Sequence, residues 1–206
     1  MQLPDADDVR SALQGYNITE QIIDDDFIDD AITDEVIPYV ERFTRSSVTG
    51  PVQIVEFHSG TGRDELMLDR KNIVSLDAIR LVSGNDIDTT INIASIVVLP
   101  KPGILKVKSG LSEYYNYRIF PKGNDNIQIT YTYGGECPPD LFRAIVMLAS
   151  IIVLDQLEGR TGGGQLSGQG YSRQYGKDGK FTNIRKRLNV RAHSILRRYS
   201  SAVIGA

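Results

Sequence analysis

The alternation of apolar and polar residues is clearest at residues 126–136. Four apolar side chains, Ile127, Ile129, Tyr131 and Tyr133, are separated by single polar residues. That period of two is typical of a strand with one buried face. Gly134 and Gly135 then interrupt the pattern and predict the end of the strand.

A buried helix is predicted directly after this strand. Pro138, Pro139 and Asp140 suit a helix start, where proline is tolerated and an acid faces the positive end of the dipole. Residues 141–154 are apolar on nearly every side, which indicates a core helix. Because a bilayer needs roughly 20 apolar residues, this run is too short to span one. Gly159 is the expected stop.

Two helical regions are expected before residue 46. Residues 4–14 predict a short helix that ends at Gly15. A second helical region extends from Asn17 or Thr19, either of which can cap it, to about Arg45. Pro38 lies inside this second region, where we expect a kink or a nearby break.

One face of the second helical region is strongly acidic. Its acids are Asp24, Asp25, Asp26, Asp29, Asp30, Asp34 and Glu35. An EF-hand loop starting at Asp24 would need a ligand at Ile28 and a glycine at Asp29, so calcium binding is disfavoured. The open alternatives are a solvated helix face and a deliberately negative surface, such as a channel lining.

Residues 51–133 have the texture of short strands. The candidates are residues 52–57, 65–69, 73–82, 91–99, 104–108, 114–120 and 127–133. Glycine-rich turn signals separate most of them, which favours an antiparallel sandwich or barrel. The sequence therefore predicts an α+β fold. Its domains are a helical body, residues 1–50 and 134–206, and an inserted β-rich module, residues 51–133.

The last helix, predicted at residues 181–201, is basic. An apolar row consists of Ile184, Leu188, Ile195 and Tyr199, with Arg191 at the remaining position. The other cations are Arg185, Lys186, Arg187, Arg197 and Arg198. Such a helix is open to four interpretations: a solvated face, or a surface for an acidic protein, nucleic acid or anionic membrane.

Charge is divided between the two ends of the chain. Residues 1–50 hold 12 acids and 3 bases, whereas residues 159–206 hold 1 acid and 10 bases. The two ends can neutralise each other within one fold, or across a head-to-tail contact between neighbouring subunits. They can also face different partners.

Sequence motifs give catalysis little support. The chain has two histidines, His58 and His193, and one cysteine, Cys137. None has a second His or Cys at metal-ligand spacing, so no metal, cofactor or catalytic residue is predicted. The glycine-rich residues 160–179 lack the spacing of a phosphate loop, and residues 1–10 do not resemble a signal peptide.

Several stretches, in order, resemble the head–tail connector (adaptor) proteins of tailed bacteriophages. They are residues 22–45; residues 60–68 with 74–81; residues 117–121, 127–131 and 138–141 with the core helix; and residues 171–176 with the basic helix. Residues 51–133 make the chain longer and richer in strands than the simplest members.

This resemblance implies a non-enzymatic structural virion protein in the neck, made in the bacterial host cytoplasm. It implies a ring, usually a dodecamer, that docks under the portal protein, extends the DNA channel and receives the next neck or tail protein. DNA would pass without specific binding, and no membrane is involved. The C-terminal segment, residues 181–206, commonly reaches the portal in this family.

These implications assign roles to the two charged surfaces. The portal or subunit interface is expected at Arg185, Lys186, Arg187, Arg191, Arg197, Arg198 and Tyr199. The acidic residues 24–35 are expected to face the channel or a subunit seam, because carboxylates repel DNA phosphates. The alternatives are a monomeric β-rich module that binds carbohydrate through Tyr114, Tyr115 and Tyr117, and a protein that binds DNA through its basic helix.

Overall fold

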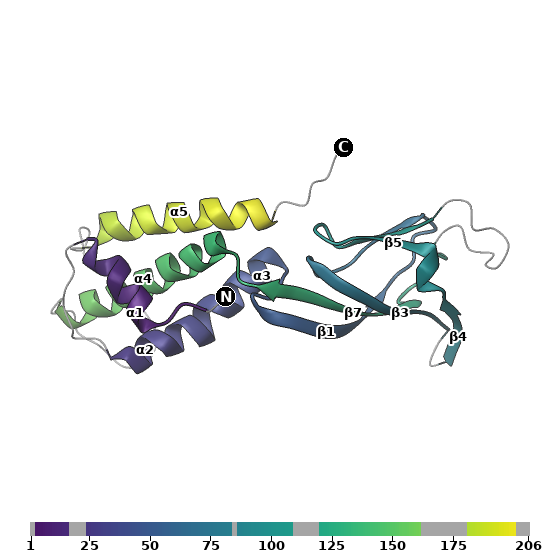
Figure 1. The fold of residues 1–206 in the computed structure, drawn as a ribbon, viewed down its shortest axis with the longest axis horizontal. Helices are drawn as coiled ribbons and strands as arrows, with labels where there is room; N and C mark the ends of the chain where they lie inside the picture. Colours follow the sequence, from purple (N-terminus) through teal and green to yellow (C-terminus); the bar gives the residue numbers. More distant parts are fainter. Residues whose placement is uncertain (1–2, 17–23, 84–85, 109–119, 162–180, 201–206) are drawn as a thin grey trace. The chain divides into compact units, whose positions relative to one another are not determined.

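The computed structural model describes residues 3–16, 24–83, 86–108, 120–161 and 181–200. The chain divides into two compact units. The helical unit comprises Met1–Phe43 and Cys137–Ser201, and the β unit comprises Thr44–Glu136. Helices and antiparallel strands thus occupy separate units (Figure 1), and the predicted α+β class is confirmed.

Helix α1 (Ala6–Gln14) begins with a reciprocal cap. The Asp5 carboxylate accepts a hydrogen bond from the backbone N–H of Asp8, and the Asp8 carboxylate accepts one from the N–H of Asp5, each at 3.2 Å. The two carboxylates thereby satisfy backbone donors that the first turn leaves unpaired. Gly15 caps the other end, where the sequence predicts it.

The acidic segment forms one helical run with a widened turn inside it. Helix α2 (Asp25–Asp30) leads into a π-helical turn, η1 (Ala31–Val36), and then into α3 (Ile37–Thr44). The N–H of Ile37 bonds to the carbonyl of Ile32, five residues earlier. Pro38 has no N–H, and its ring crowds the carbonyl four residues before it. The irregularity expected near Pro38 is therefore a π turn directly before it.

Helix α4 (Pro139–Thr161) is the central element of the helical unit, and α1, η1 and α5 all pack on it. Its apolar residues are buried or half-buried all round, as predicted. The hydroxyl of Ser150, also buried, donates to the Val146 carbonyl at 2.7 Å. The stop predicted at Gly159 is wrong, because the helix continues to Thr161. No helix in the described ranges is long and apolar enough to cross a membrane.

Helix α5 (Thr182–Ser200) buries a different row from the predicted one. The buried residues are Leu188, Ala192 and Leu196, spaced by four. Ile195 and Tyr199 are half-buried, and Arg191 is exposed. The small side chain of Ala192 lets this row lie close to α4, whereas the prediction followed only the larger apolar residues.

The β unit contains two antiparallel sheets. The four-stranded sheet has the order β1-β7-β3-β4, with β1 (Thr49–His58), β7 (Ile127–Glu136), β3 (Ile73–Ser83) and β4 (Asp86–Ile91). The three-stranded sheet has the order β2-β6-β5, with β2 (Glu65–Met67), β6 (Ile104–Val107) and β5 (Ile96–Leu99). The described strands form an open pair of sheets and no closed barrel.

One strand prediction differs from the structure, and another falls mostly outside the described residues. Residues 91–99, predicted as one strand, are divided between the end of β4, a 3-10 turn at Ile93–Ser95 (η2) and β5. Asn92 causes the division, because its side-chain oxygen accepts a hydrogen bond from the N–H of Ala94 at 2.9 Å and caps the turn. Most of the strand predicted at 114–120, including the three carbohydrate-binding tyrosine candidates, lies outside the described residues.

Strand β7 supplies much of the core that the two sheets share. Ile127, Ile129 and Tyr131 are fully buried, Tyr133 is nearly so, and the alternate residues are half-buried. This result confirms the predicted alternation. The strand end predicted at Gly134 and Gly135 is wrong, because the strand continues to Glu136. The φ angle of Gly134 is 93°. A Cβ atom there would approach the Ser47 side chain to 2.6 Å, so this position requires glycine.

Candidate functional site

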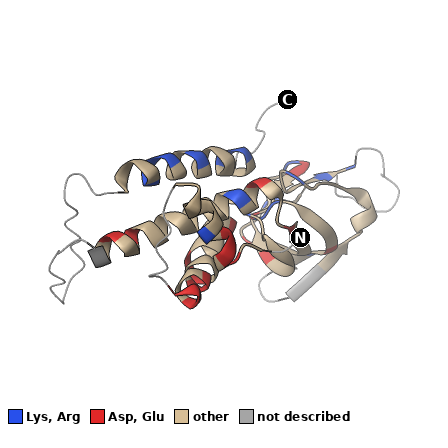
Figure 2. Ribbon diagram, turned by 60° about the vertical axis from the view of Figure 1, so that its left-hand side comes forward, with Lys and Arg blue, Asp and Glu red and all other residues tan. Residues whose placement is uncertain are grey.

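The acidic face of the helical unit is solvent-exposed. All seven predicted acids of this face lie at exposed positions on or beside α2 and η1. Ile28, Ala31, Ile32 and Val36 form the buried side of the same run. Figure 2 shows the acidic residues gathered on this segment. The sequence pattern thus separates a packed side from a charged side as predicted, and leaves the charges free to act on a partner.

Only one of the seven acids has a basic partner within the described part of the chain. Asp25 accepts hydrogen bonds from Arg10, at 2.7 Å from its Nε and at closer range from its Nη2. This pair joins α1 to α2. The remaining six carboxylates repel one another across exposed surface, so the face carries a concentrated negative field.

The basic face of α5 divides into exposed and enclosed cations. Lys186, Arg187 and Arg191 are exposed, and none contacts an acid in the ranges that the structure describes. Arg197 and Arg198 are exposed too, and Arg198 lies 3.4 Å from Asp140 of α4. Figure 2 shows the basic residues distributed along this helix.

Arg185 differs from the other cations of α5 because α4 encloses it. Its guanidinium pairs with both Asp155 and Glu158 of α4. Only 17% of the Arg185 side chain and 14% of the Glu158 side chain are exposed. The charge of Arg185 therefore stabilises the contact between two helices and is less available to a partner than the sequence suggests.

Tyr199, also predicted as an interface residue, is half-buried at the end of α5. Burial is the main cause that raises the pKa of its hydroxyl, and the Asp140 carboxylate raises this pKa further. The phenol therefore stays neutral at physiological pH and can contribute apolar contact and a hydrogen bond, but no charge.

His193 lies at the contact between α5 and α3 and stabilises it. Its Nδ1 lies 2.9 Å from the carbonyl of Asn189, which can only accept, so Nδ1 carries the proton. Its Nε2 lies 2.8 Å from the Tyr39 hydroxyl, which then donates to it. Phe43 packs edge-on against the same ring. The histidine thus links α5 to α3 through these contacts.

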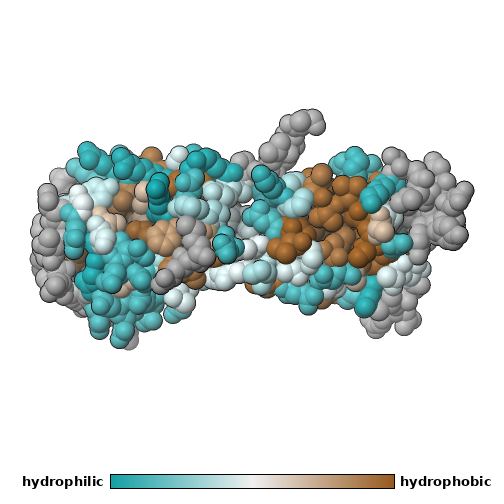
Figure 3. All heavy atoms as spheres, in the orientation of Figure 1, coloured by the Kyte–Doolittle hydropathy of each residue, from teal (hydrophilic) through white to brown (hydrophobic). Residues whose placement is uncertain are grey.

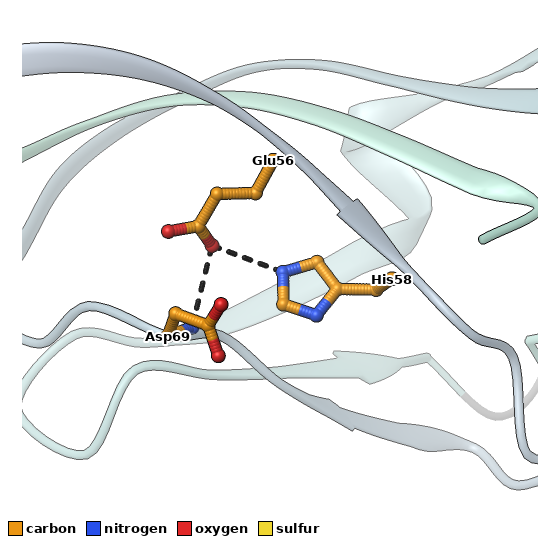
Figure 4. Close-up of side chains that lie close together, drawn as sticks. All are labelled: Glu56, His58 and Asp69. Carbon is orange, nitrogen blue, oxygen red and sulfur yellow. Dashed lines mark hydrogen bonds and ion pairs between the residues drawn. The ribbon is translucent and has the colours of Figure 1, made fainter.

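A second histidine lies in a cluster that sequence motifs did not reveal. His58 Nε2 lies 3.0 Å from Glu56 Oε2, and the N–H of Asp69 donates to that oxygen at 3.3 Å. Figure 4 shows the three side chains close together. The sequence signal for Glu56 and His58 is their spacing, because residues i and i+2 of a strand share one face. Asp69 comes from another segment, so no local motif could include it.

The β unit also has exposed apolar side chains. Except for Val190, every large exposed apolar residue in the described ranges belongs to it: Val52, Val55, Phe57, Met67, Val74, Ile93, Val97 and Leu99. Figure 3 shows apolar residues gathered over part of this unit. Three of the exposed residues lie on β1, an edge strand that pairs only with β7 among the described strands.

The single cysteine is a poor nucleophile in this fold. Cys137 is buried, and burial raises the pKa of its thiol. Because the thiolate is the reactive form, the structure disfavours covalent chemistry at this residue.

The whole fold is similar to known structures. One match is from the neck of an empty GTA particle computed with C6 symmetry, at a TM-score of 0.53, covering 100% of this chain and 99% of that chain. A second is from the virion of the native gene transfer agent (GTA) particle, at a TM-score of 0.54 and 96% coverage of that chain. A third is from the neck of the native GTA particle computed with C12 symmetry, at a TM-score of 0.51 and 99% coverage of that chain.

The chain has the fold of a protein of gene transfer agent particles. Sequence identity is 15% in all three comparisons, and both units are included because the match covers the full chain. No protein-family model matches the sequence, and no curated protein matches it significantly. Two of the three similar chains come from structures of GTA necks.

Proposed function

We propose that this chain is a structural virion protein of a tailed phage or a related particle, located in the neck. The observation that carries the proposal is the likeness over the full length of both chains to proteins from GTA necks. A likeness limited to one unit would leave the other free for an unrelated role. The fit of both units favours a neck protein over a monomeric carbohydrate-binding module.

The finer proposal is an adaptor ring beneath the portal. Necks computed with C6 and C12 symmetry support a ring, and a dodecamer is the expected state. Such a ring needs a heterologous interface, in which two different patches of the same chain meet. The ring would extend the DNA channel and receive the next neck or tail protein, with no reaction of its own.

Charge supports separate roles for the two faces of the helical unit. An acidic surface repels the phosphates of passing DNA, whereas a basic surface binds them through counterion release. We therefore assign the acidic residues 24–35 to the channel or a subunit seam. The exposed cations of α5 are assigned to a protein partner, the portal.

The decisive experiment measures assembly with the portal ring encoded in the same genome. Light scattering should show the chain shifting from its free mass to a portal-bound multimer in the absence of DNA. The triple variant Lys186→Gln, Arg187→Gln, Arg191→Gln should lose most of this binding, because these exposed cations have no acid partner in the described chain.

A matched triple variant provides the control. Thr182→Ala, Asn183→Ala and Asn189→Ala change exposed neutral residues of the same helix and should bind the portal normally. Circular dichroism would verify that both variants are folded. A folded wild-type chain that ignores the portal would contradict the adaptor assignment, and equal loss in both variants would contradict the role of the cations.

A further inference from the structure

The cluster around His58 has the composition of a metal site. It contains one imidazole from His58 and two carboxylates from Glu56 and Asp69, and one ligand atom of each lies within 4.8 Å of the others. Glu56 and His58 are half-buried, and Asp69 is exposed. A nitrogen ligand with two oxygen ligands suits a borderline divalent ion such as Zn²⁺ better than Mg²⁺ or Ca²⁺.

The fold brings these three residues together from two segments. Glu56 and His58 are paired in register with Ile129 and Ile127, which are fully buried, so both point to the inner face of the four-stranded sheet. Asp69 follows β2 of the other sheet. Arg45 holds this segment in place, because its guanidinium donates to the carbonyls of Leu68 and Asp69, each at 2.6 Å.

The ligand atoms of Glu56 and His58 are close to the spacing that coordination requires. Two ligands about 2.1 Å from a tetrahedral ion are separated by about 3.4 Å. His58 Nε2 and Glu56 Oε2 now lie 3.0 Å apart, at hydrogen-bond distance. An ion would replace the proton that they now share, and the two atoms would move apart by about 0.4 Å.

A separate observation comes from Tyr131, which is fully buried on the neighbouring strand β7. No atom of the described residues lies at hydrogen-bond geometry to its hydroxyl. Tyr131 pairs with Ile54 of β1, two residues before Glu56, so the two side chains lie on the same face of the sheet. The Glu56 carboxylate and the Arg70 backbone are polar groups close to this hydroxyl. A phenol in this position can donate to Glu56, and such outer-shell donors orient metal-bound carboxylates.

The charges nearby are compatible with a cation. With neutral His58, the two carboxylates give the cluster a charge of about −2, which a divalent ion would balance. Arg45 Nη2 lies 4.0 Å from Asp69 Oδ1, and both side chains are partly exposed to solvent. The Arg70 guanidinium lies over the Tyr133 ring, 5.4 Å from its centroid.

We propose that Glu56, His58 and Asp69 bind one divalent transition-metal ion, with Zn²⁺ as the preferred ion. The ion would link edge strand β1 to the segment after β2 and thereby join the two sheets of the β unit. This site is independent of the proposed neck function, since it concerns the stability of one unit and no contact with the portal.

Calorimetric titration of ZnCl₂ into the full 206-residue chain, purified without an affinity tag, tests the proposal. The expected result is one saturable site per chain and a rise in Tm that a chelator reverses. His58→Asn and Asp69→Asn should each weaken binding at least about tenfold. His193→Asn is the matched control, since it removes the only other histidine, and should leave zinc affinity unchanged.

Two further measurements keep the test decisive if a ligand variant fails to fold. X-ray absorption of the wild-type zinc complex should show only nitrogen and oxygen neighbours, whereas a sulfur neighbour would place the ion at Cys137 and overturn the proposal. Tyr131→Phe should lower zinc affinity, because it removes the hydroxyl that lies beside Glu56. Absence of a saturable site, or equal affinity in His58→Asn, would also overturn it.

Discussion

Arg185 is the cation of α5 whose surroundings define its role most clearly. It lies between Asp155 and Glu158, two carboxylates that would repel each other without it. Because the three side chains are largely shielded from water, removing the positive charge leaves an uncompensated negative pair. The ordinary surface cations beside it carry no such constraint.

The substitution Arg185→Gln should therefore destabilise the helical unit. We expect a loss of about 2 kcal/mol in the free energy of unfolding, less than for a fully buried pair because each group keeps some contact with water. Urea unfolding at pH 7 measures the effect. Lys186→Gln, an exposed neighbour, is the control and should change stability by less than about 0.5 kcal/mol; equal effects would refute the structural role.

The sequence predicted which residues are exposed better than it predicted which residues they contact. The acids of residues 24–35 are exposed as predicted, because helical spacing alone separates them from Ile28 and Val36. The pairing of Arg185 with α4, and of His58 with Asp69, depends on segments that are distant in sequence. No local pattern records which two segments will meet.

At the level of elements, strand β1 is open to new contacts. It is 10 residues long, and its outer edge has no strand partner among the described residues. Val52, Val55 and Phe57 are each more than 40% exposed. A long, apolar edge strand is a template for pairing with another strand, and proteins usually protect such edges with charge or proline.

We predict that Val55→Lys reduces self-association of the free chain at high concentration. A lysine on this edge would oppose pairing with a second copy, while leaving the free energy of unfolding within about 0.5 kcal/mol because Val55 is exposed. Sedimentation velocity over a concentration series measures the effect. The same substitution at Val190, which is 63% exposed on α5, is the control; an unchanged mass distribution for Val55→Lys would contradict the prediction.

The elements themselves were predictable where one pattern dominated. Strand β7 and the core of α4 follow from alternation and from a continuous apolar run. Prediction was poorer where a single small or polar residue decided the outcome. Ala192 shifts the buried row of α5, Asn92 interrupts the expected strand, and Gly159 is accommodated within a helix that tertiary packing extends.

For the whole molecule, the organising feature is segregation of charge along the sequence. The acids of the first 50 residues are concentrated on α2 and η1, and the bases of the last 48 include those of α5. Within the described residues, the ion pairs of these two faces lead to other elements: Asp25 pairs with Arg10 of α1, and Arg185 and Arg198 pair with acids of α4. The exposed charges of the two faces are those to which we assign assembly and the exclusion of DNA.

Reversing the acidic face should make the assembled protein bind DNA. In the portal-bound form, the variant Asp29→Lys, Asp30→Lys, Asp34→Lys should retain a duplex of any sequence at low salt, with log affinity falling by about 0.9 per log unit of salt for each phosphate contacted. Fluorescence anisotropy measures this binding. The matching Asn variant should fall between wild type and the Lys variant, and DNA binding by wild type itself would contradict the assignment of this face.

The pairing of β1 with β7 has a consequence for how such proteins can diversify. Thr49, near the start of the β unit, is the direct partner of Glu136 at its end, so the chain enters and leaves this unit at adjacent points. Because loop-closure entropy grows only with the logarithm of length, the segment between these points can be shortened, enlarged or exchanged at little energetic cost to the helices. The β unit can thus change in length and sequence during evolution while the helical unit keeps its fold.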